Sequence, residues 1–280
     1  MEKPQPIEFV GEWGVRGTDP GQLEDPVGPA MDSVGRVYVA DRAAGLVEKF
    51  EASGVPLLSF ESPAARTADS IAVDSGGAIY VTNSHTGAMQ LFFPQGDPLR
   101  ILRVAPQKGT DSPFVFSIDS DGRIYVPDPL RARVQVLSSS GSLLKVWRVL
   151  PDASEKAALP FAAVADRDAV YVGDAADGRI LKFTLEGVQI TGFKEPDSDD
   201  ASRLLGFAVA ARHLFALRGF PLRIEIWSLD GHREWVDTLG GRLSAIKSAA
   251  YLAGDEAGDF VVLDPEGSRV LHFRVRSDLP

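Results

Sequence analysis

The segment Pro113–Gly141, PFVFSIDSDGRIYVPDPLRARVQVLSSSG, decides the fold of this chain. An apolar stretch leads to turn residues at 119–122, and the pair Tyr125-Val126 then leads to Asp128. Leu137 follows nine residues after Asp128, and Gly141 follows four residues after Leu137. Short apolar runs separated by Asp, Ser and Gly indicate β-strands joined by tight turns.

The same unit recurs along the whole chain. Its central part stands at residues 38–41, 80–83, 125–128, 171–174, 215–218 and 261–264, with successive copies 42, 45, 46, 44 and 46 residues apart. Nine residues after each of these segments comes a large apolar residue: Phe50, Phe92, Leu137, Phe183, Trp227 and Phe273. In five copies a glycine lies four residues further on. Repeats of about 40–50 residues with these strand signals are typical of propeller blades.

Each unit is interpreted as four short strands, so we predict an all-β protein, a six-bladed β-propeller with four antiparallel strands per blade. Too few residues follow Phe273 for a fourth strand in the last blade. The segment 7–13, IEFVGEW, resembles the outer strands of other blades. We therefore expect this N-terminal strand to close the last blade, which protects a sheet edge.

The innermost strands are expected to carry small side chains where the six strands converge on the axis. We take the first turn residue of the blades as Asp32, Asp74, Asp119, Asp166, Ala210 and Ala253. Four residues earlier stand Gly28, Ser70, Val115, Ala162, Gly206 and Ala249. Most of these residues are small, as six converging strands require.

The unit resembles the NHL repeat, which runs roughly Pro-x-Gly-apolar-Ala-apolar-Asp, Gly-x-apolar-Tyr-Val-x-Asp, Arg-apolar-x-x-Phe, Gly. The third copy, from Pro113 to Gly141, is the clearest. The fifth departs most, with Arg218 in place of the acidic residue, and the sixth lacks the tyrosine. The resemblance implies one NHL-type propeller domain over residues 1–280. It does not select a function, because the family includes RNA- and protein-binding modules, extracellular sensor domains and an amidating lyase.

Composition narrows the classes of partner and site. The net charge of -10 makes nucleic acid an unlikely partner. The absence of cysteine removes disulfides and thiolate sites. No apolar run reaches the roughly 20 residues of a membrane span. The protein is expected to be soluble, and its location stays open between the cytosol and, the option that we favour, secretion or the periplasm with a signal removed.

Residues that recur in nearly every blade are interpreted as structural. The carboxylates at the end of the second strand can accept backbone N–H bonds in the following loop, and the arginines that begin the third strand follow the same repeat. The residues concerned are Asp41, Asp128, Asp174, Asp264, Arg133, Arg179, Arg223 and Arg269.

An enzyme is the less favoured interpretation. The family's lyase resembles a zinc enzyme with histidine ligands, but His213 and His232 fall in bottom turns, His272 falls within a strand, and His85 alone reaches the top. Lactonases of the same architecture place acidic ligands around the axis. Asp25, Asp69 and Asp111 are the candidates here, although Arg203 and Lys247 near the opposite strands would oppose a cation. We expect no cofactor and no tightly bound catalytic metal.

The favoured hypothesis is a non-catalytic scaffold that presents top-face loops to a protein, peptide or glycan with an acidic group. Arginine and aromatic residues are typical of interface anchors. The candidate ligand-binding residues are Arg218, Phe220, Arg223, Arg242, Lys247 and His85. For Arg218 itself, the favoured interpretation is an ion pair with the acidic run 197–200 of the same blade, and the binding role is the alternative.

Overall fold

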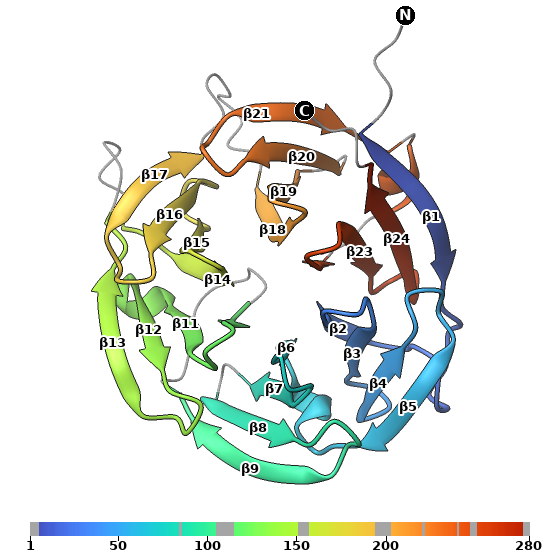
Figure 1. Cartoon of the computed structure of the whole chain (residues 1–280). Helices are drawn as coiled ribbons and strands as arrows, with labels where there is room; N and C mark the ends of the chain where they lie inside the picture. Colours follow the sequence, from blue (N-terminus) through green and yellow to red (C-terminus); the bar gives the residue numbers. More distant parts are fainter. Residues whose placement is uncertain are drawn as a thin grey trace, which may run out of the picture.

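The chain folds into a ring of six sheets around a central axis (Figure 1). The structure, a computed structural model, describes residues 6–83, 86–104, 115–150, 157–193, 203–219, 222–239, 241–246 and 251–276. Each sheet has four strands, and neighbouring strands pair antiparallel. The predicted six-bladed β-propeller is therefore confirmed.

The blades follow one another along the chain, each running from the axis outward. Blade 1 holds β2 (Pro26–Met31), β3 (Val37–Asp41), β4 (Leu46–Phe50) and β5 (Pro56–Glu61). Blade 2 holds β6 (Ser70–Val73), β7 (Ile79–Asn83), β8 (Ala88–Phe92) and β9 (Pro98–Arg103). Blade 3 holds β10 (Ser117–Ile118), β11 (Ile124–Asp128), β12 (Arg133–Leu137) and β13 (Leu143–Arg148). Blade 4 holds β14 (Pro160–Asp166), β15 (Ala169–Asp174), β16 (Ile180–Thr184) and β17 (Gln189–Phe193).

The last two blades complete the ring. Blade 5 holds β18 (Leu204–Ala210), β19 (His213–Arg218), β20 (Arg223–Ser228) and β21 (Arg233–Asp237). Blade 6 holds β22 (Tyr251–Gly254), β23 (Asp259–Asp264), β24 (Arg269–Val275) and β1 (Ile7–Trp13). The helical elements in the described residues are the short 3-10 turns η1 (Ala65–Thr67), η2 (Pro129–Arg131) and η3 (Arg242–Ala245). No helix within the described ranges is long and apolar enough to cross a membrane.

The N-terminal strand closes the ring, as the sequence predicts. β1 pairs antiparallel with β24 from Ile7 opposite Val275 to Trp13 opposite Val270 (Figure 1). The Trp13 ring also packs on Phe50 of blade 1, and its indole nitrogen donates a hydrogen bond of 3.1 Å to the carbonyl of Ala52. The first strand of the chain therefore ties blade 6 to blade 1.

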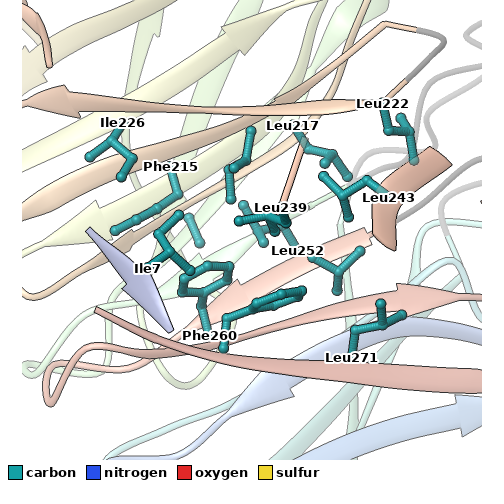
Figure 2. Packing of buried hydrophobic residues seen from close by; sticks show 14 of the residues in the cluster. Ile7, Phe215, Leu217, Leu222, Ile226, Leu239, Leu243, Leu252, Phe260 and Leu271 are labelled. Carbon is teal, nitrogen blue, oxygen red and sulfur yellow. The ribbon is translucent and has the colours of Figure 1, made fainter. Parts of the chain in front are cut away.

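The core lies between adjacent blades, because both faces of each sheet are apolar. Figure 2 shows one of these layers, where Phe215 and Leu217 of blade 5 face Phe260 and Leu271 of blade 6, with Ile7 of β1 beside them. Five further clusters fill the other parts of the ring. Side chains that alternate along a strand can enter the layers on its two sides, which explains the nearly continuous apolar character of the second strands.

The ring has a bottom face and a top face. The bottom face carries the turns between the first and second strands and between the third and fourth strands of each blade. The top face carries the loops between the second and third strands and the connections between blades.

The turn of blade 6 differs from the sequence-based assignment. Ala253 lies inside β22, and the turn begins at Asp255, whose side chain accepts backbone N–H bonds of 3.0 Å from Gly258 and Asp259. The crowded axial position of this blade therefore belongs to Tyr251, which pairs with Leu263, and not to Ala249. A large side chain occupies the position where the other blades mostly have small ones.

Candidate functional site

The repeated acidic residues at the ends of the second strands serve the blades themselves. Asp41 is fully buried and accepts a 2.6 Å bond from the backbone N–H of Glu24. Asp128 is also fully buried and lies 2.7 Å from the Nε of Arg133, and the same arrangement recurs at Asp174–Arg179 and Asp264–Arg269. These carboxylates stabilise the loops and strands of their own blades, as the sequence predicts.

The structure places Arg218 in the interior, so it does not offer an exposed anchor. Only 4% of its side chain is exposed, and its Nε lies 2.8 Å from Oε2 of Glu225. Its Nη1 donates a 2.6 Å hydrogen bond to the carbonyl of Gly178 in blade 4. Blade 3 has Asp128 and Gln135 at the two corresponding positions. Where blade 3 has Asp128 and Gln135, blade 5 therefore has the buried ion pair of Arg218 and Glu225. The acidic run 197–200, the partner predicted from the sequence, lies outside the described residues.

The remaining candidates of the top face are only partly brought together. Arg223 joins Arg218 on the same carboxylate, with its Nε 3.3 Å from Oε1 of Glu225. Arg242 is exposed at the start of η3, and its guanidinium carbon lies 3.7 Å from the centroid of the Phe9 ring. The other sequence candidates, Phe220, Lys247, His85 and Asp111, lie outside the described residues.

The top mouth of the axis holds a charged group formed by blades 1, 2 and 6. The guanidinium of Arg42 donates two hydrogen bonds of 2.9 Å to the carboxylate of Asp25, and both side chains are about half exposed. Burial raises the pKa of the Tyr251 hydroxyl, and the nearby charges of Arg42, Asp69 and Asp25 also act on it. Asp25 and Asp69 therefore both lie close enough to act on Tyr251, a convergence that their different offsets in the sequence do not show. Because Asp25 is neutralised by Arg42, it is a poor ligand for a divalent cation. Among the described residues, no group of three His, Asp or Glu side chains could hold a metal ion.

On the bottom face, blades 1 to 3 share one turn. An aspartate accepts backbone N–H bonds from residues further along the turn, and its other oxygen accepts a hydrogen bond from the tyrosine six residues later. The tyrosine bonds are Tyr38 to Asp32 at 2.9 Å, Tyr80 to Asp74 at 3.0 Å and Tyr125 to Asp119 at 2.9 Å. Burial, followed by the adjacent carboxylate, raises the pKa of the Tyr80 hydroxyl to about 12.

Blades 4 and 5 depart from this turn and leave a cleft between them. Their first hairpins have two-residue loops, because Asp166 pairs directly with Ala169 and Ala210 with His213. In blade 5 both loop residues have positive φ, 45° at Ala211 and 62° at Arg212, as a type I′ turn requires. The tyrosine of blade 4, Tyr171, is five residues after Asp166 instead of six, and no described residue bonds its hydroxyl.

The cleft has a volume of about 440 Å³. Its lining residues are Asp166, Arg167, Asp168, Ala169, Tyr171, Lys182, Ala211, Arg212, His213, Ser228, Leu229, Asp230 and Glu234. The binding residues predicted from the sequence belong to the top face, and none of them lines this cleft. The signal that could have revealed it is the spacing from turn residue to second strand, which is one residue shorter in blades 4 and 5.

Comparison with known proteins defines the fold and not the family. No family model matches the chain, and no curated protein matches it. A streptogramin B lyase structure has 13% identity and a TM-score of 0.64 over 97% of this chain and 88% of that chain. Virginiamycin B lyase from Staphylococcus aureus has 12% identity and a TM-score of 0.63 over 96% and 100%. The Cps50 (Swd1) propeller domain of Myceliophteria thermophila has 10% identity and a TM-score of 0.68 over 95% and 100%. At sequence identities this low, the comparison shows only that the chain shares the propeller fold of these three structures.

Proposed function

We propose that this protein is a non-catalytic binding scaffold whose top-face loops recognise an acidic group on a protein, peptide or glycan. The observation that carries the proposal is the set of guanidinium groups at the surface of these loops. Arg66 in η1 and Arg242 in η3 are exposed. Arg131 in η2 is exposed beside its partner Asp128, and Arg42 at the axis is about half exposed while it bonds Asp25. Guanidinium forks suit carboxylate, sulfate and phosphate groups.

The charge balance of the molecule supports this choice of face. The net charge is -10, and the bottom turns carry the recurring aspartates Asp32, Asp74 and Asp119. An acidic partner would be repelled by that face and attracted by arginines on the other. A propeller also holds its loops on rigid blades, which lowers the entropy lost on binding.

Binding of sulfated glycans and acidic peptides to immobilised protein tests the proposal. We expect the triple variant Arg42→Gln, Arg66→Gln and Arg242→Gln to lose at least about tenfold in affinity for a ligand that the wild type binds. The matched control replaces three exposed cations on the rim and bottom, Arg100, Arg103 and Arg212, by Gln. Equal affinity of the two triple variants, or no binding by the wild type, contradicts the proposal.

The alternative is a metal-dependent lactonase, hydrolase or lyase with its site at the top of the axis. It is favoured by the similarity to the streptogramin B lyases over nearly the whole chain and by the proximity of Asp25 and Asp69. One of those lyase structures is a catalytically inactive variant with a histidine replaced by alanine, in complex with quinupristin. Of this chain's described histidines, His213 and His232 lie at bottom turns, and His272 is buried 2.8 Å from Asp259. A stoichiometric divalent ion in the purified protein, lost in Asp25→Ala or Asp69→Ala, would favour the enzyme.

A further inference from the structure

The cleft between blades 4 and 5 is distinct from the proposed top-face surface, because it opens on the opposite face of the ring. Its floor is Tyr171, which is fully buried as a residue and yet lines the cleft. The equivalent residues Tyr38, Tyr80 and Tyr125 all donate hydrogen bonds to their turn aspartates. Tyr171 has no such bond with any described residue and lines the cleft, so its hydroxyl is open to a partner that enters the cleft.

Several charged groups of the cleft already have partners. Arg167 lies 2.8 Å from Glu256 of blade 6, and Nε2 of His213 lies 3.2 Å from Glu234. Lys182 donates a 2.9 Å hydrogen bond to the carbonyl of Leu229, and its ammonium lies 5.8 Å from the centroid of the Tyr171 ring. These side chains are therefore occupied within the protein.

The groups left over are mostly carboxylates. Asp166, Asp168 and Asp230 take part in no ion pair with a described residue, and Arg212 is the one lining cation of the described cleft without a bonded partner. The three carboxylates act together on Tyr171. Burial and the charges of Asp166 and Asp230, with a smaller contribution from Asp168, raise the pKa of its hydroxyl, and the charge of Arg212 partly offsets them. The cleft therefore offers a surplus of negative charge beside a hydroxyl that stays protonated.

We propose that this cleft binds an organic cation, an ammonium or guanidinium group whose N–H donors reach the carboxylates of Asp166, Asp168 and Asp230 and the oxygen of Tyr171. A cation can pair with carboxylates that have no ion pair with a described residue, and an N–H donor can bond the Tyr171 oxygen. A cavity of about 440 Å³ falls within the range of small-ligand pockets, about 300–1,000 Å³, and admits a flexible chain behind the charged head. The cation could be a free polyamine or a basic side chain of a peptide, which share this chemistry.

Isothermal titration calorimetry at low ionic strength tests the site with two probes, spermidine and a trimeric arginine peptide. We expect wild type to bind at least one probe, and the double variant Asp168→Asn and Asp230→Asn to lose about tenfold or more in affinity. Tyr171→Phe should lose about fivefold, the effect of one hydrogen bond. This variant is expected to fold, because blade 5 has Phe215 at the same position and the lost hydroxyl bonds no described residue.

The matched control removes the same charge elsewhere. Asp97→Asn and Asp121→Asn neutralise exposed bottom turns of blades 2 and 3, and they should bind like wild type. Binding of spermidine alone would identify a polyamine site, and binding of the peptide alone a site for basic side chains. No binding of either probe by wild type, or equal losses in the cleft and control variants, overturns the proposal. Neither outcome depends on the top-face arginines, so the two proposals fail separately.

Discussion

Phe9, in the first strand of the chain, packs edge-on against Phe273 in the last, with ring centroids 5.5 Å apart and an angle of 61° between the planes. The two residues are also opposite one another in the β1–β24 ladder. Nearly the whole chain separates them, and yet they form one blade. The closure of the ring therefore depends on the contacts of a single short strand.

Deletion of residues 1–13 should destabilise the protein strongly. The deletion removes the ladder with β24 and the packing of Ile7, Phe9 and Trp13, which together are worth about 5 kcal/mol or more. We expect Tm to fall by about 10 °C or more in thermal unfolding followed by circular dichroism. Deletion of residues 1–5, which precede β1, is the control. A Tm unchanged by the longer deletion would contradict closure by β1.

The buried pair Arg218–Glu225 should be replaceable by the pattern of blade 3. Arg218→Asp alone should cost about 3–5 kcal/mol, because it leaves two carboxylates together in a buried place. Combined with Glu225→Gln, the same substitution recreates the Asp128 and Gln135 arrangement, with Arg223 available to pair as Arg133 does. Denaturant unfolding of the single and double variants measures the coupling. Additive losses in the double variant would refute this account.

Glu48 should make stability depend on pH. Its carboxylate is buried and forms no ion pair with a described residue. It accepts hydrogen bonds from Ser59 and from the backbone of Gly21, and burial raises its pKa above the ordinary value of 4.5. The folded state therefore holds a proton that the unfolded state releases at lower pH. The stabilising contribution is complete below the ordinary pKa and is lost as pH rises through the folded pKa.

Glu48→Gln should consequently be more stable than wild type at neutral pH, by about 1 kcal/mol, and this advantage should shrink toward pH 4. Blades 2 and 3 already have Gln90 and Gln135 at this position. Tm measured from pH 4 to pH 8 checks the effect, and Gln135→Glu provides the reverse substitution. A difference between Glu48→Gln and wild type that stays constant with pH would rule out the carboxylate as its source.

Gly28 should tolerate no side chain. Its φ is 55°, and a Cβ atom there would lie 2.6 Å from the Cα of Ser70 in the next inner strand. Gly28→Ala should lower the free energy of unfolding by more than about 1 kcal/mol, through both the left-handed backbone and the clash with backbone atoms. In Gly11→Ala, the control, the added Cβ meets nothing within 4 Å. Equal unfolding midpoints for the two variants would show that the inner strands can separate without loss.

The sequence predicts the fold well because the features that define a blade are local and repeated. The spacing from Asp128 to Leu137, held in six copies, determines a hairpin, and six hairpins at regular intervals leave few arrangements other than a ring. The closure by β1 is also predictable, because the last blade lacks one strand. The start of the blade 6 turn is predicted two residues early, since Ala253 is counted as a turn residue where Asp255 makes the turn bonds.

The candidate site is less predictable because it depends on contacts between blades. Arg218 is expected at the surface from its place after the second strand, but the compensating residue, Glu225, lies in the next strand, and Gly178 lies in another blade. The cleft of blades 4 and 5 has a local cause in a shortened turn. Its effect, a tyrosine without its usual partner, is visible only when the two blades are side by side.

The closure by β1 also bears on the order of events during synthesis. β1 is synthesised before the other strands of the ring, and its hydrogen-bonding partner, Arg269–Val275, is synthesised after them. Blades 1 to 5 can pair their strands as they emerge, whereas β1 must wait with Ile7, Phe9 and Trp13 unburied. Such a long-range pairing forms slowly and leaves a nascent chain with one open edge and apolar side chains in water. During translation, the strand that completes the native ring is therefore the segment that we expect a chaperone to bind.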